Sequence, residues 1–161
     1  LDIEDFKKKL DKKSRLMGID PGRRRIGIAI SDENKIIATP YSTIIKNKYS
    51  DFVKEIIKIV NDNQIKGIVV GNPINMDGSS SQSSQSAKDL AMNLSKDVTE
   101  NITMWDERLS SQGAFNLSND LGSNTSKKVS KLDQNSAQFI LQGALDYLTI
   151  KNTWSNTVKR L

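Results

Sequence analysis

The sequence has 161 residues, of which 36% are hydrophobic and 27% charged, with a formal net charge of +5. This length suits one domain with its own hydrophobic core. The chain has no cysteine and no histidine, which excludes disulfides, zinc fingers, thiolate nucleophiles and histidine bases. Any catalysis must therefore use carboxylates, lysine, tyrosine, hydroxyl groups or an oxygen-bound metal. The positive charge suits a polyanionic partner, although many proteins are slightly basic.

The first half of the chain predicts a charged extension followed by three strands. Residues 1–14 are rich in charge, and we expect a short helix or a loose extension outside the core. Turn signals at residues 21–22 and 32–34 separate the strands that follow. Pro40 indicates an edge position or a bulge in the third strand. The expected strands are 15–20, 26–31 and 35–44, which form an antiparallel meander.

The second half alternates helices with strands. Apolar residues recur at helical spacing around 53–60, 87–94 and 137–148. We expect strands at 66–71 and 102–106, and a further helix over 110–121. The order βββαβαβα predicts an α/β fold with one mixed five-stranded sheet and helices on its faces. This domain spans residues 15–152, and residues 153–161 form a C-terminal tail.

No targeting or membrane segment is visible in the sequence. The longest apolar runs are well below the roughly 18 residues that a membrane span needs. The N-terminus also lacks the apolar core of a secretory signal. We therefore expect a cytoplasmic protein without a membrane partner.

The first segment that could carry chemistry is the sequence GIDPG at residues 18–22, which three arginines follow. Asp20 lies at the end of a predicted buried strand, where a carboxylate is costly unless it binds a metal or accepts hydrogen bonds. The alternative is an aspartate that caps a tight turn, beside solvated arginines.

The second segment is the loop at residues 71–79, which follows a buried strand and precedes a helix. Its backbone amides and the start of that helix could hold a phosphate. The serine-rich run at 80–86 is more typical of plain flexible sequence.

The third segment is the sequence WDER at 105–108, again at a strand end. Strand alternation puts Thr103, Trp105 and Glu107 on one face and Asp106 on the other, so one acid should face a given site. Periodicity does not decide which acid that is. A surface ion cluster is the alternative.

The fourth segment, residues 127–133, opens the last predicted helix with three lysines and Asp133. Ser130 and Asp133 have the spacing of a helix capping pair, which would make Asp133 structural. Asp133 also shares a helical face with Ala137 and Ile140, and a carboxylate on such a face needs a partner. The lysines are either solvated or in contact with phosphate.

Together these segments place three acids at element ends of one mixed sheet. Such carboxylates can converge on two magnesium ions, which prefer oxygen ligands. Two-ion catalysis cuts phosphodiesters without any histidine. The pattern therefore favours a metal-dependent nuclease.

The four segments, in this order and spacing, resemble the YqgF family over about residues 15–150. Members of that family are described as Holliday-junction-resolvase-like proteins and as pre-16S rRNA nucleases. The motifs that carry the resemblance lie at residues 18–27, 71–79, 106–109 and 131–143. The sequence departs from the pattern at Asn72, Ser136 and Arg23, and residues 1–14 are not part of it.

The resemblance implies an RNase H-like fold with helices on both faces of the sheet. It implies that Asp20, Glu107 and Asp133 are the catalytic residues and the ligands of Mg²⁺ or Mn²⁺, and so selects Glu107 over Asp106. The residues expected to contact substrate are Arg23, Arg24, Arg25, Asn75, Asp77, Gly78, Arg108, Lys127 and Lys128. The implied function is endonucleolytic processing of the 5′ end of precursor 16S rRNA, with the pre-ribosomal particle as partner.

Three alternatives stay open on the sequence. A Holliday junction resolvase would cut branched DNA symmetrically and require a homodimer, whereas trimming one RNA end could be the work of a monomer. A non-catalytic ribosome-assembly module would bind RNA, although clustered carboxylates would repel it. An ATP-binding protein of the actin type would need two such domains, and this length supplies one.

Overall fold

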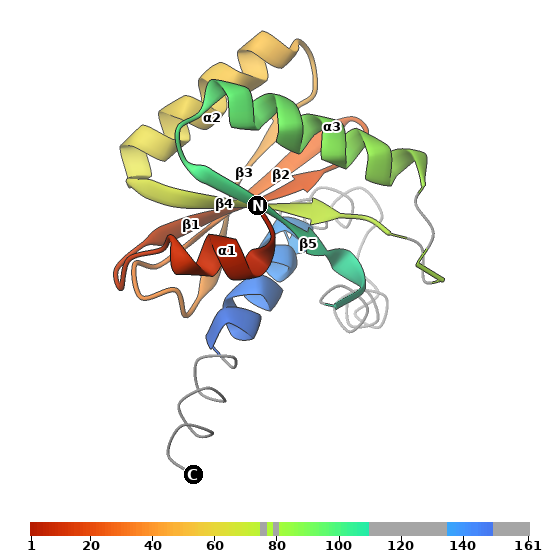
Figure 1. The fold of residues 1–161 in the computed structure, drawn as a ribbon. Coiled ribbons are helices and arrows are strands. Elements are labelled where there is room, and N and C mark those ends of the chain that lie inside the picture. The colour runs from red at the N-terminus through yellow and green to blue at the C-terminus, as the bar shows by residue number, and fades with distance from the viewer. Residues whose placement is uncertain (75–76, 79–80, 110–134, 150–161) are drawn as a thin grey trace, which may run out of the picture.

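The computed structural model describes residues 1–74, 77–78, 81–109 and 135–149, and a five-stranded mixed sheet organises them (Figure 1). The strand order is β3-β2-β1-β4-β5. β1 and β3 each pair antiparallel with β2, whereas β1, β4 and β5 run parallel. The predicted α/β class and the meander are confirmed. The strands are β1 Arg15–Pro21, β2 Arg25–Ser31, β3 Ala38–Ile45, β4 Ile65–Asn72 and β5 Asn101–Asp106.

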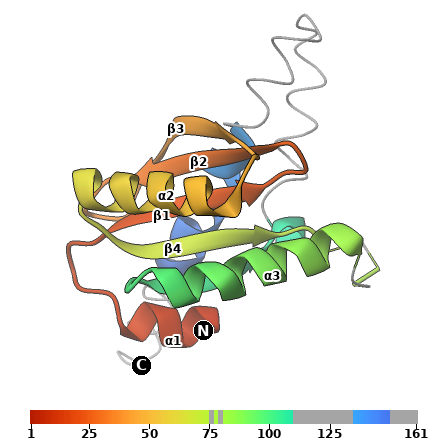
Figure 2. The ribbon, with the colours of Figure 1, turned by 90° about the horizontal axis from the view of Figure 1, so that it is seen from above.

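Helices cover both faces of this sheet, as Figures 1 and 2 show. α2 and α3 pack on one face, while α1 and the helix over residues 135–149 pack on the other. The expected helix over 110–121 lies outside the described residues. None of the helices in the described ranges is long and apolar enough to cross a membrane. The labelled helices are α1 Ile3–Lys8, α2 Tyr49–Asn63, α3 Gln82–Asp97 and the 3₁₀ turn η1 Glu107–Leu109.

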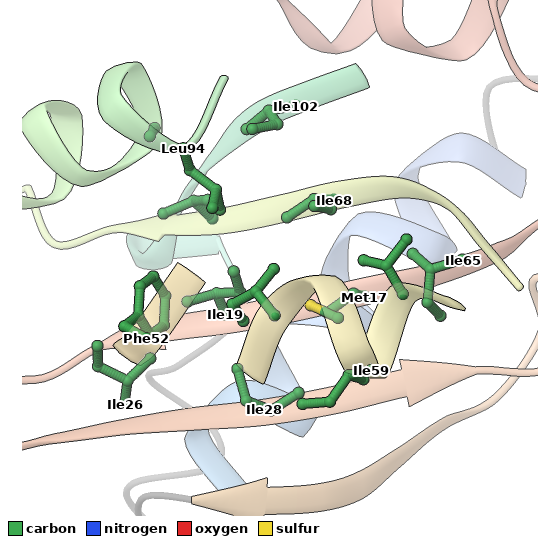
Figure 3. Close-up of a cluster of buried hydrophobic side chains, with 14 residues drawn as sticks. Met17, Ile19, Ile26, Ile28, Phe52, Ile59, Ile65, Ile68, Leu94 and Ile102 are labelled. Carbon is green, nitrogen blue, oxygen red and sulfur yellow. The ribbon is translucent and has the colours of Figure 1, made fainter. Parts of the chain in front are cut away.

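Two apolar clusters fill the space between the sheet and its helices. The cluster under α2 and α3 is built from large aliphatic side chains, including Ile19, Ile28 and Ile68, which are fully buried (Figure 3). The cluster on the opposite face uses Leu16 and Val69 of the sheet, and alanine and leucine residues of the helix over 135–149. Burying this much apolar surface on both faces is the main force that holds the layers together.

The N-terminal helix α1 belongs to the core, and the expectation that residues 1–14 lie outside it is wrong. Phe6 is 0% exposed and packs in the second cluster. The Phe6 ring lies over Gly67 of β4 and fills the space that a side chain there would need. A Cβ on Gly67 would lie 2.7 Å from Phe6 Cζ. The Leu1 amino group also donates to the Ile102 carbonyl at 3.2 Å. Phe6, with Ile3 and Leu10 packed against the same cluster, therefore docks this charged segment on the sheet.

The third strand lies at an edge of the sheet and contains a bulge, so both alternatives considered for Pro40 are present. Ile28 is opposite Ser42 and Ala29 is opposite Pro40, which leaves Tyr41 without a partner in the register. Proline lacks an N–H and is tolerated only at such positions of a sheet. The strand begins at Ala38, three residues later than expected.

Candidate active site

The parallel strands bring three chain segments to one edge of the sheet. β1, β4 and β5 run in the same direction, so their carboxyl ends meet there. Asp20 is the penultimate residue of β1, while Asn72 and Asp106 pair at the ends of β4 and β5. Ligands in open α/β sheets bind at this edge.

Asp20 and Glu107 face the side of the sheet that the helix over 135–149 covers. A Cβ on Gly18 would lie 2.7 Å from Leu141 Cβ, and Asp20 shares the face of Gly18 by strand alternation. A Cβ on Gly71 would lie 3.3 Å from Glu107 Oε1 and 2.6 Å from Ile140 Cδ1. The Glu107 carboxyl group therefore lies over the end of β4, beside this helix.

The two carboxyl groups influence each other electrostatically. Burial, and then the negative charges of Asp20 and Asp106, raise the pKa of Glu107 from 4.5 to about 7. Asp20 itself is half-buried and has further interactions. Two oxygen-donor groups that disfavour each other's charge fit a divalent cation, which would neutralise both.

The neighbouring acid, Asp106, has a different environment. Its carboxylate accepts hydrogen bonds from Arg108 Nε at 3.0 Å and from Arg108 Nη2 at 2.6 Å. The hydrogen bonds from Arg108 lower the pKa of Asp106, against the opposing effect of burial. The structure thus separates the two adjacent acids: Asp106 pairs with an arginine, and Glu107 lies near Asp20.

The turn between β1 and β2 carries the three predicted arginines to this same edge. Arg23, Arg24 and Arg25 are exposed. Gly22 permits the turn, because a Cβ there would collide with the Arg25 carbonyl oxygen. Their positive charge therefore lies next to Asp20 in the chain and open to solvent.

The loop after β4 is described only in part. Asp77 and Gly78 are exposed, and Gly78 has a φ of +88°, which favours glycine. A Cβ on Gly78 would lie 3.4 Å from Arg108 Nη1. The pKa of Arg108 is raised mainly by its hydrogen bond with Asp106, and the charge of Asp77 adds to the effect. Arg108 thus links the end of β5 to this loop.

Several predicted site residues lie outside the described residues: Asn75, Lys127, Lys128 and Asp133. Within the described ranges, no group of three or more acidic, histidine or cysteine side chains could hold a metal. Asp133 precedes the first described residue of the last helix by two positions. That helix passes over Gly18 of β1, two residues before Asp20, and over Gly71 of β4, which lies next to the Glu107 carboxyl group.

Two features of this edge were missed in the sequence. Asn72 is buried, and its Oδ1 accepts a hydrogen bond of 2.7 Å from Ser84 of α3, so this departure from the family pattern ties β4 to α3. Lys46 follows β3, and its backbone N–H donates to the Arg24 carbonyl at 2.8 Å. The predicted antiparallel meander could have indicated the place of Lys46, since it returns the end of the third strand to the turn between the first two strands.

Comparison with known proteins agrees with this architecture. The model of a family described as "RuvX: Holliday junction resolvase" matches residues 14–147. The chain belongs to the RuvX family. A Pelagibacter ubique relative named "Putative pre-16S rRNA nuclease" is 53% identical over 146 residues, which cover 91% of this chain and 97% of the relative. A Rhodobacter capsulatus protein of the same name is 40% identical, over 91% of this chain and 92% of its own length.

A solved structure shares the fold of this RuvX member. Thermus thermophilus RuvC, in complex with Holliday junction substrate, has a TM-score of 0.51 and 8% identity, and the match covers 86% of this chain and 95% of RuvC. At this identity the likeness shows the fold alone. The RNase H-like fold expected from the sequence is thereby confirmed.

Proposed function

We propose that this protein is a divalent-metal-dependent endonuclease that processes the 5′ end of precursor 16S rRNA. The observation that carries the proposal is the placement of Asp20 and Glu107 at one sheet edge, where their charges disfavour each other. The names of the relatives support the substrate. Such a substrate would make the pre-ribosomal particle its partner and the cytoplasm its place of action.

In this proposal Asp20, Glu107 and Asp133 hold Mg²⁺ or Mn²⁺. Carboxylates suit these hard cations, and the chain has no histidine or cysteine to attract softer metals. Bound cations supply the Lewis acidity and water activation for an in-line displacement at phosphorus. The positions of two of the proposed ligands support this, because Asp20 is the penultimate residue of β1 and Glu107 directly follows β5.

The basic residues around the acids position the substrate. Arg23, Arg24 and Arg25 contact backbone phosphates from the β1–β2 turn, and Lys127 and Lys128 do so from the segment before the last helix. Arg108, Asp77 and Gly78 lie near one another and add further contacts, and Asn75, outside the described residues, is proposed as another. Contacts of this kind fix the orientation of a nucleic acid without reading its sequence, so specificity follows from the shape of the RNA.

A second candidate function is cleavage of branched DNA. The family description and the RuvC-like fold favour it. Symmetric cutting of a four-way junction requires two active sites related by a two-fold axis, so this function predicts a homodimer. Trimming of an RNA end needs a single active site.

The test is cleavage of a labelled precursor 16S rRNA leader and of a labelled four-way DNA junction, each with magnesium and with chelator. Asp20→Asn should lower cleavage by on the order of 10³-fold, equivalent to about 4 kcal/mol of activation barrier. The matched control is Asp62→Asn, an exposed aspartate on α2, which should cleave like the wild type.

The substrate that is cut decides between the two functions. Magnesium-dependent cutting of the RNA alone supports rRNA processing by a monomer. Symmetric cutting of the junction alone supports the resolvase function. Binding of RNA with no cleavage of either substrate would overturn both and support a ribosome-assembly module.

A further inference from the structure

A pocket of about 300 Å³ opens beside the β1–β2 turn, on the α3 side of the sheet. It is lined by the turn residues 21–23, by Lys46 and by Gln82, Ser83 and Ser86 at the start of α3. Glu107 lies on the other side, toward the helix over 135–149. The pocket is therefore separate from the paired acids, although Pro21, which lines it, directly follows Asp20.

The charge of the pocket is positive. Arg23 reaches it from the turn and Lys46 from the end of β3, and none of the lining residues is acidic. A backbone hydrogen bond of 2.8 Å from Lys46 N–H to the Arg24 carbonyl holds these two segments together. Arg23 of the β1–β2 turn and Lys46 after β3 thus line one concave surface, and their positive charges attract an anion.

The third wall adds hydrogen-bond donors. The Ser81 side chain caps the N–H of Ser84, while the N–H groups of Gln82 and Ser83 have no acceptor among the described residues. The start of α3 is held in place, because buried Ser84 donates to Asn72 of β4 at 2.7 Å. The first turn of this 16-residue helix contains no acid. Backbone amides at a helix start favour an anion, which here would also meet Arg23 and Lys46.

We propose that this pocket binds a backbone phosphate of the RNA substrate, one that neighbours the phosphate held at the acids. This inference rests on the proposed function and adds to it the path of the RNA strand across the protein surface. The RNA crosses the end of β1, with the scissile phosphate at Asp20 and Glu107 and an adjoining phosphate among Arg23, Lys46 and the α3 amides. Lys46 and the amides of Gln82 and Ser83 then contact substrate from the side opposite Glu107.

The first experiment measures binding of the labelled RNA leader as a function of salt, in an Asp20→Asn background so that the RNA stays intact. The variant Lys46→Glu should weaken binding by roughly tenfold and reduce the salt dependence by about one phosphate contact. The control is Lys66→Glu, an exposed lysine at the start of β4 and so at the opposite end of the sheet. It should bind nearly as the parent does.

A second variant guards against misfolding. Ser83→Glu places a negative charge in the pocket, yet an acid in the first turn of a helix stabilises the fold. It should unfold at or above the temperature of the parent while binding RNA at least about tenfold more weakly. Parent-like RNA binding by both Lys46→Glu and Ser83→Glu would overturn the proposal.

A third arm separates backbone phosphate from free phosphate. Inorganic phosphate is titrated while the amide NMR signals of Gln82 and Ser83 are followed in the parent and in Lys46→Glu. Shifts with phosphate but no effect of the variants on RNA would assign a free-anion site and overturn the RNA path. Absence of cleavage by the wild type would instead remove the proposed function, and the binding results would still report on the pocket.

Discussion

The two faces of the sheet are built differently. Under α2 and α3, the strands present large side chains such as Ile19, Ile28 and Ile68, and the helices rest on them. Under the helix over 135–149, β1 and β4 present Gly18 and Gly71, so the helix lies close to the backbone. The first face supplies bulk for stability. The second allows close approach, and it is also the face on which Asp20 and Glu107 meet.

Removing bulk from the first face should give the largest change in stability. Ile28→Ala deletes a side chain that is 0% exposed, and the resulting cavity should lower the free energy of unfolding by about 3–4 kcal/mol. Urea denaturation measures this loss. Cleavage at a temperature where the variant stays folded should remain within about twofold of the wild type, a factor worth only about 0.4 kcal/mol. A large loss of cleavage in the folded variant would contradict the division between the faces.

Adding bulk to the second face should affect both stability and cleavage. In Gly18→Ala the new Cβ would lie 2.7 Å from Leu141 Cβ and 3.1 Å from the Ala137 carbonyl oxygen. Displacement of the helix should cost about 2 kcal/mol of stability and reduce cleavage.

The combination Gly18→Ala with Leu141→Gly tests whether that contact is the cause, because only glycine removes the Cβ that the new methyl group would meet. Because the two residues touch, the double variant should be less destabilised than the sum of the single variants, by about 1 kcal/mol. Simple additivity would show that the clash between Gly18→Ala and Leu141 is not responsible.

The coupled acids predict a pH dependence of the metal-free protein. The pKa of Glu107 is about 7 in the folded chain against 4.5 ordinarily, so the native state holds this proton longer and loses stability as pH rises from about 4.5 to 7. Glu107→Gln, which mimics the protonated form, should match the wild type at pH 4. At pH 8 with chelator it should be more stable by about 2 kcal/mol, a value reduced for partial exposure.

Thermal unfolding at several pH values measures this difference. Excess magnesium should remove it, because a bound cation favours the charged form of Glu107 in the wild type alone. An equal gain in stability at pH 4 and pH 8 would rule out the electrostatic explanation.

The smallest effect is expected at Asp106. Its ion pair with Arg108 is partly exposed, with side-chain exposures of 33% for Arg108 and 22% for Asp106. Asp106→Asn should therefore change the free energy of unfolding by less than about 1 kcal/mol. Urea denaturation of Asp106→Asn and of Glu107→Gln compares the effects of the two adjacent acids on the free energy of unfolding. A loss of stability in Asp106→Asn as large as that in Ile28→Ala would contradict this prediction.

The order and type of the elements were predictable because hydrophobic periodicity and turn-forming residues can be read from short stretches of sequence. Residues 15–20 and 66–71 contain runs of apolar residues that end at turn signals, and the structure has strands there. The relative faces of Asp106 and Glu107 also followed from alternation. Alternation does not state which face the last helix covers, so the choice of acid came from the family resemblance. The catalytic roles of the three acids stay predictions.

Other features depend on contacts that the sequence does not display. The burial of Phe6 requires the vacant position over Gly67, which is 61 positions further along the chain. The place of Lys46 beside the first turn depends on the register between β2 and β3, which a bulge shifts. Both are long-range consequences of packing: the predicted meander returns the third strand to the first turn, but local patterns do not give the register that places Lys46 or the position that Phe6 fills.

The rims of the sheet bear on how the chain behaves when it is concentrated. Exposed edge strands invite pairing with a strand of another molecule, which leads to aggregation. On the β3 rim, Pro40 removes one donor and the bulge at Tyr41 breaks the even spacing of the others. On the β5 rim, Leu1 engages the Ile102 carbonyl and the Thr103 hydroxyl. Both rims therefore carry features that hinder strand addition, and we expect them to disfavour edge-to-edge polymerisation of the sheet.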